Sequence, residues 1–197
     1  MPDVPYYDVQ YDPLWAVASE ARVPVTIHRT GVSTKEQPLT FPDAAPGLNV
    51  VGTVQRFFSA INPISNLIFT GLFDRFSDLH FIAAEVNCGW VPALAQQMDQ
   101  EFERMRYWAR LPLSSEPSSY LGTNVFVTML DDFVGCRMAK EDPVLARTTT
   151  FSTDYPHSTT LWPRSREFVA KMTEGMHEET KQAIVAGNAL RAYFLDG

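Results

Sequence analysis

The sequence has few of the features that mark disulfide-rich, metal-stapled or membrane proteins. Its only cysteines are Cys88 and Cys136, which lie far apart with no Cys-x-x-Cys spacing. This argues against a disulfide framework or a thiolate zinc site, and we expect two reduced, buried thiols. No run reaches the about 18 apolar residues of a membrane-spanning helix. The first residues have neither the basic end nor the apolar centre of a secretory signal. These absences predict a cytoplasmic protein without a membrane partner.

Positive charge is also scarce, with 16 Lys and Arg against 23 Asp and Glu and a net charge of −7. A broad electrostatic grip on nucleic acid is therefore not expected. The sequence contains no Gly-x-x-x-x-Gly-Lys-Ser/Thr phosphate loop, no Gly-x-Gly-x-x-Gly after an expected strand and no Gly-x-Ser-x-Gly elbow. Nucleotide-binding and serine-hydrolase functions thus lose their usual motifs.

Aromatic residues, in contrast, are plentiful, and hydrophobic residues make up 45% of the 197 positions. This balance predicts a folded interior rather than disorder. Apolar segments of strand character alternate with helical patterns, which is typical of a parallel α/β fold with strands buried on both faces. Strands are expected over residues 23–28, 79–85, 124–130 and 144–152, and helices over 14–21, 50–72, 92–110, 163–174 and 177–186, followed by Gly187-Asn188 and a terminal turn. Asp131 or Asp132 is expected to cap the helix after the third strand.

Polar side chains that can bind metals or move protons follow the ends of these strands. Because chemistry in parallel α/β folds gathers at the carboxyl ends of the strands, these positions are candidate site residues. They are His28 and Arg29, Glu85, residues 128–131, and Asp154 with His157. A histidine ending a buried strand can offer a ring nitrogen to a zinc ion, and a carboxylate at a strand mouth can transfer protons.

Structural roles remain open for each of these residues. His28 could bond to a loop carbonyl, and Asp154 with His157 could form an Asx-type turn with a surface histidine. Glu85 could form a salt bridge with Arg29 or Arg137. Trp90 could wall a substrate pocket, although a buried tryptophan is more often part of a core.

Six motifs, taken in chain order, bear on the choice between structural and functional roles for these residues. The first three are Tyr-Asp-Pro-Leu-Trp at 11–15, Pro-Val-Thr-Ile-His at 24–28 and Phe-Asp-Arg-Phe-Ser-Asp-Leu at 73–79. The other three are Glu-Val-Asn-Cys-Gly-Trp-Val-Pro at 85–92, Thr-Asp-Tyr-Pro-His-Ser at 153–158 and Gly-Asn at 187–188. Together they resemble the carboxyl-terminal half of the amidohydrolase-related family. This branch of the amidohydrolase superfamily includes aminocarboxymuconate-semialdehyde decarboxylase and the resorcylate-type decarboxylases.

The resemblance implies a metal-dependent (β/α)₈ TIM-type barrel in which residues 1–197 supply strands five to eight. His28 and Asp154 match metal-binding positions of the family, with zinc expected and manganese as the alternative. Asp154 and Glu85 are the expected catalytic residues, although the characterised decarboxylases have a histidine near the position of Glu85. His157, Trp90 and Arg29 are expected to bind a small-molecule substrate.

One part of the family pattern is absent from the sequence. The family's first strand ends in His-x-His or Glu-x-His and provides two metal ligands, and neither motif occurs here. The expected metal site is therefore incomplete, and 197 residues fall short of the about 250 of a typical barrel. The implied activity is hydrolysis or nonoxidative decarboxylation of a small carboxylated or cyclic substrate. The alternatives are a non-catalytic half-barrel that pairs with a second copy or another chain, and an inactive remnant.

Overall fold

Four short parallel strands form the centre of the chain. The structure, a computed structural model, describes residues 4–28 and 46–196. The strands are β1 (Val25–His28), β2 (Phe81–Ala84), β3 (Val125–Met129) and β4 (Thr149–Phe151). They lie side by side in the order β1-β2-β3-β4, and each neighbouring pair is parallel. The predicted α/β class with a parallel sheet is confirmed, and all four strands fall within segments where strands were predicted.

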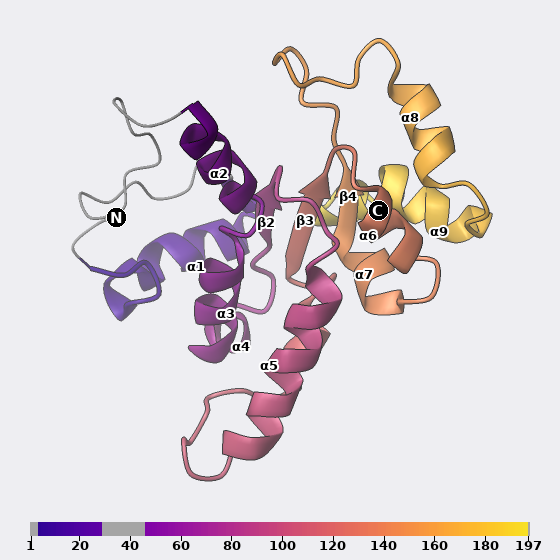
Figure 1. Cartoon of the computed structure of the whole chain (residues 1–197). Coiled ribbons are helices and arrows are strands. Elements are labelled where there is room, and N and C mark those ends of the chain that lie inside the picture. Colours follow the sequence, from indigo (N-terminus) through magenta and orange to yellow (C-terminus); the bar gives the residue numbers. More distant parts are fainter. Residues whose placement is uncertain (1–3, 29–45, 197) are drawn as a thin grey trace.

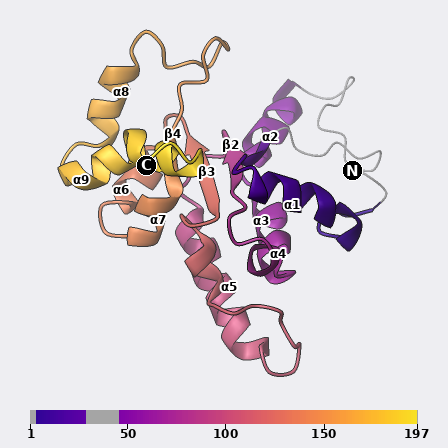
Figure 2. The same ribbon diagram turned by 180° about the vertical axis from the view of Figure 1, so that it is seen from behind.

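Helices connect the successive strands, as parallel pairing requires. Figures 1 and 2 show α1 to α4 gathered on the side of β2, and α6 to α9 gathered on the side of β4. Before β1 come η1 (Val9–Tyr11) and α1 (Asp12–Glu20), and between β1 and β2 come α2 (Pro46–Arg56), α3 (Ile61–Phe69) and α4 (Leu72–Arg75). Between β2 and β3 come α5 (Val91–Met105) and η2 (Pro117–Tyr120), and between β3 and β4 come α6 (Phe133–Met138) and α7 (Pro143–Thr148). After β4 come α8 (Ser165–Met172), α9 (Glu178–Gln182), the π-helical turn η3 (Ala183–Gly187) and α10 (Asn188–Ala192).

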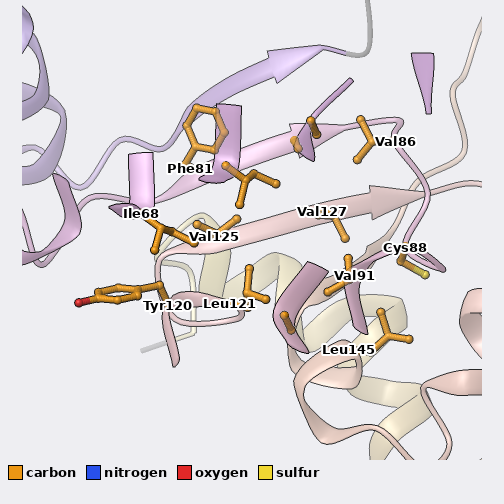
Figure 3. Close-up of a cluster of buried hydrophobic side chains, with 14 of the residues drawn as sticks. Ile68, Phe81, Val86, Cys88, Val91, Tyr120, Leu121, Val125, Val127 and Leu145 are labelled. Atoms are coloured by element: carbon orange, nitrogen blue, oxygen red, sulfur yellow. The ribbon is translucent and has the colours of Figure 1, made fainter. Parts of the chain in front are cut away.

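One face of the sheet forms the main hydrophobic core. Figure 3 shows Phe81, Val125 and Val127 of the sheet in a cluster that includes Ile68 of α3 and Val91 of α5. None of these side chains is more than 1% exposed. Side chains alternate between the two faces along a strand. Since Phe81, Val125 and Val127 point into this core, the even-numbered residues of β2 and β3 point to the opposite face.

The opposite face is covered only in part. Ile82 and Phe126 pack against Ala192 of α10, whereas Thr26 and His28 of β1 are exposed. The prediction that the first strand is buried on both faces is therefore wrong. On this face α10 packs through Ala192 against β2 and β3, whereas the even-numbered side chains of β1 stay exposed.

The predicted strand over residues 144–152 is also mostly wrong, because α7 occupies its first half. The Asp142 side chain caps this helix by accepting a hydrogen bond from the Leu145 amide at 2.9 Å. Pro143 stands in the first turn, where its missing N–H costs nothing. Asp-Pro before an apolar run was thus a helix start, and only Thr149–Phe151 remains extended.

Gly187-Asn188 does not end the last helical stretch, because η3 continues directly into α10, and the predicted terminal turn follows at residues 193–194. Asn188 is 1% exposed and donates from Nδ2 to the carbonyls of Ala146 and Thr149, at 2.7 Å each. Its Oδ1 accepts a hydrogen bond from Arg191 at 2.7 Å. Asn188 therefore anchors the last helix to α7 and β4 instead of ending a helix.

Replacing Asn188 with Ala is expected to lower the free energy of unfolding by about 2–4 kcal/mol, because two buried carbonyls would lose their donor. Urea unfolding followed by circular dichroism measures this. Gln182→Ala, at an exposed position on α9, serves as the control and should change stability by less than about 0.5 kcal/mol. Equal stability of the two variants would contradict the anchoring role.

Four further features of the fold bear on the predictions from the sequence. Cys88 and Cys136 are both free and buried, as predicted. Within residues 4–28 and 46–196, no helix is both long and apolar enough to cross a bilayer. The helix predicted over 92–110 ends at Met105, and Trp108 beyond it is 71% exposed. The helical stretch predicted over 50–72 divides into α2, α3 and α4.

Candidate metal centre

The carboxyl ends of β1, β2 and β4 bring together most of the side chains expected at a site. His28 is the last residue of β1, Glu85 directly follows β2, and Asp154 comes three residues after β4. His28 Nε2 lies 3.1 Å from Glu85 Oε2. Glu85, Asp154 and His157 each offer a ligand atom, and these atoms lie within 4.8 Å of one another. The predicted strand-end residues His28, Glu85, Asp154 and His157 therefore form one connected group.

Both carboxylates in this group stand on an unusual backbone. Glu85 has φ 57° and Asp154 has φ 56°, the left-handed conformation that residues with a Cβ rarely adopt. Such a conformation costs about 1–2 kcal/mol per residue and persists where surrounding contacts hold it. At Glu85 the contact is direct, because its amide donates to Thr128 Oγ1 at 2.7 Å.

The turn that follows Glu85 is held by the carboxylate of Asp132. Its Oδ2 accepts hydrogen bonds from the amides of Cys88 and Gly89, at 2.8 Å each. Its Oδ1 accepts from the Gly135 amide at 2.8 Å and so caps α6. Of the two caps predicted, Asp132 is confirmed. One carboxylate thus fastens the turn between β2 and α5 to the start of α6.

Asp154 sits inside a loop that closes on itself. Its Oδ1 lies 2.6 Å from His157 Nδ1, and its Oδ2 accepts a hydrogen bond from Thr159. The loop is closed at its base, where the Leu161 amide and Thr160 Oγ1 donate to the Thr153 carbonyl at 3.1 and 2.8 Å. The Asp154 side chain is 2% exposed, whereas that of His157 is 67% exposed. A buried carboxylate therefore lies beneath an accessible imidazole.

The electrostatics of Asp154 keep it ionised. Burial by itself raises its pKa, but hydrogen bonds with Glu85, Thr159 and His157, together with the charge of His157, outweigh this and lower the pKa to about 2. A depressed carboxyl pKa means that the stabilising contacts are lost only as the pH falls toward this value. Asp154 is therefore a carboxylate at neutral pH, the form that a metal ion requires.

The donor set fits a divalent cation. Two carboxylates and an imidazole within 4.8 Å of one another are oxygen and nitrogen ligands of the kind that manganese and zinc accept. Within the part of the chain that the structure describes, this is the one group of three or more His, Cys, Asp or Glu side chains close enough to share an ion. His28, in contact with Glu85, could add a fourth donor.

The remaining predicted site residues lie elsewhere. Arg29 is outside the described residues. Trp90 is 9% exposed, and its indole donates to the Val86 carbonyl at 2.8 Å, which ties it to the turn after Glu85. The sequence placed Thr128 only within the strand-end range 128–131, and it did not indicate Thr159. Both residues contact the central group through their hydroxyls.

The sequence matches the family described as Amidohydrolase over residues 1–195. The chain belongs to the amidohydrolase family. A search of curated proteins finds no match. Solved structures of amidohydrolase-family barrels share the fold, so the four-stranded sheet corresponds to part of a (β/α)₈ barrel.

Three of these structures illustrate the likeness. One is the 5-carboxyvanillate decarboxylase LigW from Sphingomonas paucimobilis, with a TM-score of 0.73 and 20% identity over 98% of this chain and 56% of that one. Another is the 2,6-dihydroxybenzoate decarboxylase from Rhizobium, with a TM-score of 0.69 and 19% identity over 99% and 59%. The third is a dihydroxybenzoic acid decarboxylase from Polaromonas sp. JS666 with bound manganese and the inhibitor 2-nitroresorcinol, with a TM-score of 0.66 and 18% identity over 99% and 57%. This amidohydrolase chain thus spans little more than half the length of these relatives.

Proposed function

We propose that this chain supplies the carboxyl-terminal half of a divalent-metal-dependent amidohydrolase-family enzyme that decarboxylates a small aromatic carboxylate in the cytoplasm. The observation that carries the proposal is the Glu85, Asp154 and His157 group, whose ligand atoms lie within 4.8 Å at the carboxyl ends of the strands. The choice of decarboxylation over hydrolysis is supported by relatives that are decarboxylases of hydroxylated aromatic acids.

We propose Asp154 as the principal metal ligand, with His157, Glu85 and His28 as the other donors of this chain. The carboxylate-rich set suits manganese, which two relatives carry, while zinc remains the alternative from the resemblance. When bound, the ion would polarise an oxygen of the substrate. Since the family's first-strand ligands are absent from this sequence, further ligands would come from outside residues 1–197.

Glu85 is proposed to handle the proton. In nonoxidative decarboxylation the bond between the ring carbon and the carboxylate breaks, carbon dioxide leaves, and a proton takes its place on the carbon. Glu85 makes a hydrogen bond that lowers the pKa of the Asp154 carboxyl, so the two side chains are in contact. His28 Nε2 lies 3.1 Å from Glu85 Oε2, so His28 stands beside the group that moves the proton.

The remaining predicted residues are proposed as substrate contacts. His157 is exposed beside Asp154, where its imidazole can donate a hydrogen bond to a substrate oxygen. Arg29, the residue after His28, is proposed to pair with the substrate carboxylate. Trp90 would border the substrate only with the small part of its surface that is exposed.

An assay of carbon dioxide release from 2,6-dihydroxybenzoate and 5-carboxyvanillate, with added Mn²⁺, tests this function. Glu85→Gln is expected to lower kcat by about 10²–10⁴-fold, because an amide cannot transfer the proton. Glu20→Gln, at an exposed position on α1, is the control and should be as active as the wild type. Metal-dependent hydrolysis without carbon dioxide release would favour the hydrolytic alternative. No metal-dependent turnover by the wild type would count against an enzymatic role for this chain.

A second candidate is that this half-barrel associates with a second half. In the described residues the outer edges of β1 and β4 have no strand partner, and unpaired edges favour association. A second copy is the partner proposed here, with a separate chain as the alternative. Light scattering after size exclusion should then give at least twice the 22.2 kDa of one chain. A single monomeric peak would contradict self-association.

A further inference from the structure

We infer that Thr128 is a positioning residue that holds Glu85 where its carboxyl group meets Asp154 and His28. This inference rests on the proposed metal site and adds a role for β3, the strand that supplies none of the proposed metal donors. β1 supplies His28, β2 leads into Glu85, and the loop after β4 supplies Asp154. Thr128 lies near the carboxyl end of β3, between β2 and β4.

Thr128 accepts hydrogen bonds from two successive backbone amides that directly follow β2. The Glu85 amide donates to its hydroxyl oxygen at 2.7 Å, and the Val86 amide donates to its carbonyl oxygen at 3.2 Å. Regular pairing between β2 and β3 ends one step earlier, at Ala83 and Val127. The hydroxyl therefore provides the acceptor for the Glu85 amide where the backbone ladder stops.

The position of this hydrogen bond matters because of the Glu85 backbone. Glu85 has φ 57°, and the left-handed conformation is disfavoured for any residue with a Cβ. Contacts on both sides of the residue must hold it there. Fixing both the Glu85 and Val86 amides to one threonine sets the direction in which the Glu85 side chain leaves the strand, toward His28 Nε2 and the Asp154 carboxylate.

The sheet contains a matched threonine for comparison. Thr150 on β4 is the register partner of Thr128, yet its hydroxyl donates to the Val127 carbonyl at 3.2 Å. Thr128 and Thr150 are thus the same residue type in adjacent strands, and it is Thr128 whose hydroxyl accepts the Glu85 amide. A valine at either position keeps the shape and removes the hydroxyl.

Titration calorimetry with Mn²⁺ alone, on the full 197-residue chain, measures the effect on the metal site. Thr128→Val is expected to weaken Mn²⁺ binding by about 10-fold, the lower end of the effect of outer-shell partners, and Thr128→Ser should restore it to within about 2-fold. Thr150→Val should leave the affinity unchanged. In a Glu85→Gln background, Thr128→Val should have no further effect, because its influence passes through Glu85. Unchanged affinity in Thr128→Val, or an equal loss in both backgrounds, would overturn the inference.

A second measurement needs no metal and so separates this inference from the proposed function. Crystal structures of the metal-free wild type and Thr128→Val should show Glu85 leaving the left-handed conformation in the variant, with its carboxyl group turned from Asp154. If the wild type binds no Mn²⁺ but Glu85 shifts as expected, the proposed metal function fails and the positioning role stands. If Glu85 keeps its conformation in Thr128→Val, the positioning role is wrong whatever the metal result.

Discussion

Replacing Asp154 with Asn is expected to weaken Mn²⁺ binding by more than about 100-fold, beyond the range typical of outer-shell partners. Asp154 is the most buried donor of the group, and its depressed pKa, about 2, keeps it charged at neutral pH. Asparagine retains the shape and one acceptor oxygen, so contacts with Thr159 and His157 can persist in part while the negative charge is lost. Titration calorimetry measures the affinity, and thermal unfolding checks that the loop remains folded.

The matched control for this substitution is Asp131→Asn. Asp131 also follows a strand at the same edge of the sheet, but it is exposed, and the described contacts of its side chain include none with the metal group. Its replacement should leave Mn²⁺ affinity within about 2-fold, since exposed charges are screened. If both variants bind Mn²⁺ like the wild type, Asp154 is not a ligand and the proposed site is wrong.

Replacing Asp132 with Ala is expected to give the largest loss of stability, about 3–5 kcal/mol. Its carboxylate accepts hydrogen bonds from three backbone amides in two segments. The substitution removes the cap of α6 and leaves two amides of the turn after Glu85 without their acceptor. Urea unfolding followed by circular dichroism measures this loss. Asp131→Ala removes the neighbouring, exposed carboxylate and should change stability by less than about 0.5 kcal/mol. A similar small change in both variants would show that the three hydrogen bonds do not fasten the turn.

The sequence predicted the arrangement of the strands better than their lengths. Strands buried between helices have a continuous apolar character that survives without tertiary information, as in Phe81–Ala84. Residues 143–151 also combine apolar and β-branched residues, and periodicity cannot separate a helix from a strand over so short a run. There the deciding contact was the Asp142 cap, a local signal that the strand pattern concealed.

The candidate site was predictable where a topological rule applied. Parallel strands place their carboxyl ends at one edge, so His28, Glu85 and Asp154 could be grouped from their positions alone. No comparable rule identifies Thr159, because the loop from Asp154 returns to its own side chain only through the observed turn. Thr128 stood within a strand-end range, but its contact with Glu85 depends on where β2 stops pairing with β3.

A crystal structure of this chain grown with Mn²⁺, with anomalous difference density measured at the manganese edge, tests the central claim most directly. The account predicts one peak bounded by Glu85, Asp154 and His157, with His28 on the Glu85 side, and no such peak in Asp154→Asn crystals. A peak at another place, or full occupancy retained in Asp154→Asn, would contradict the claim that the strand ends of this half-barrel form the metal site.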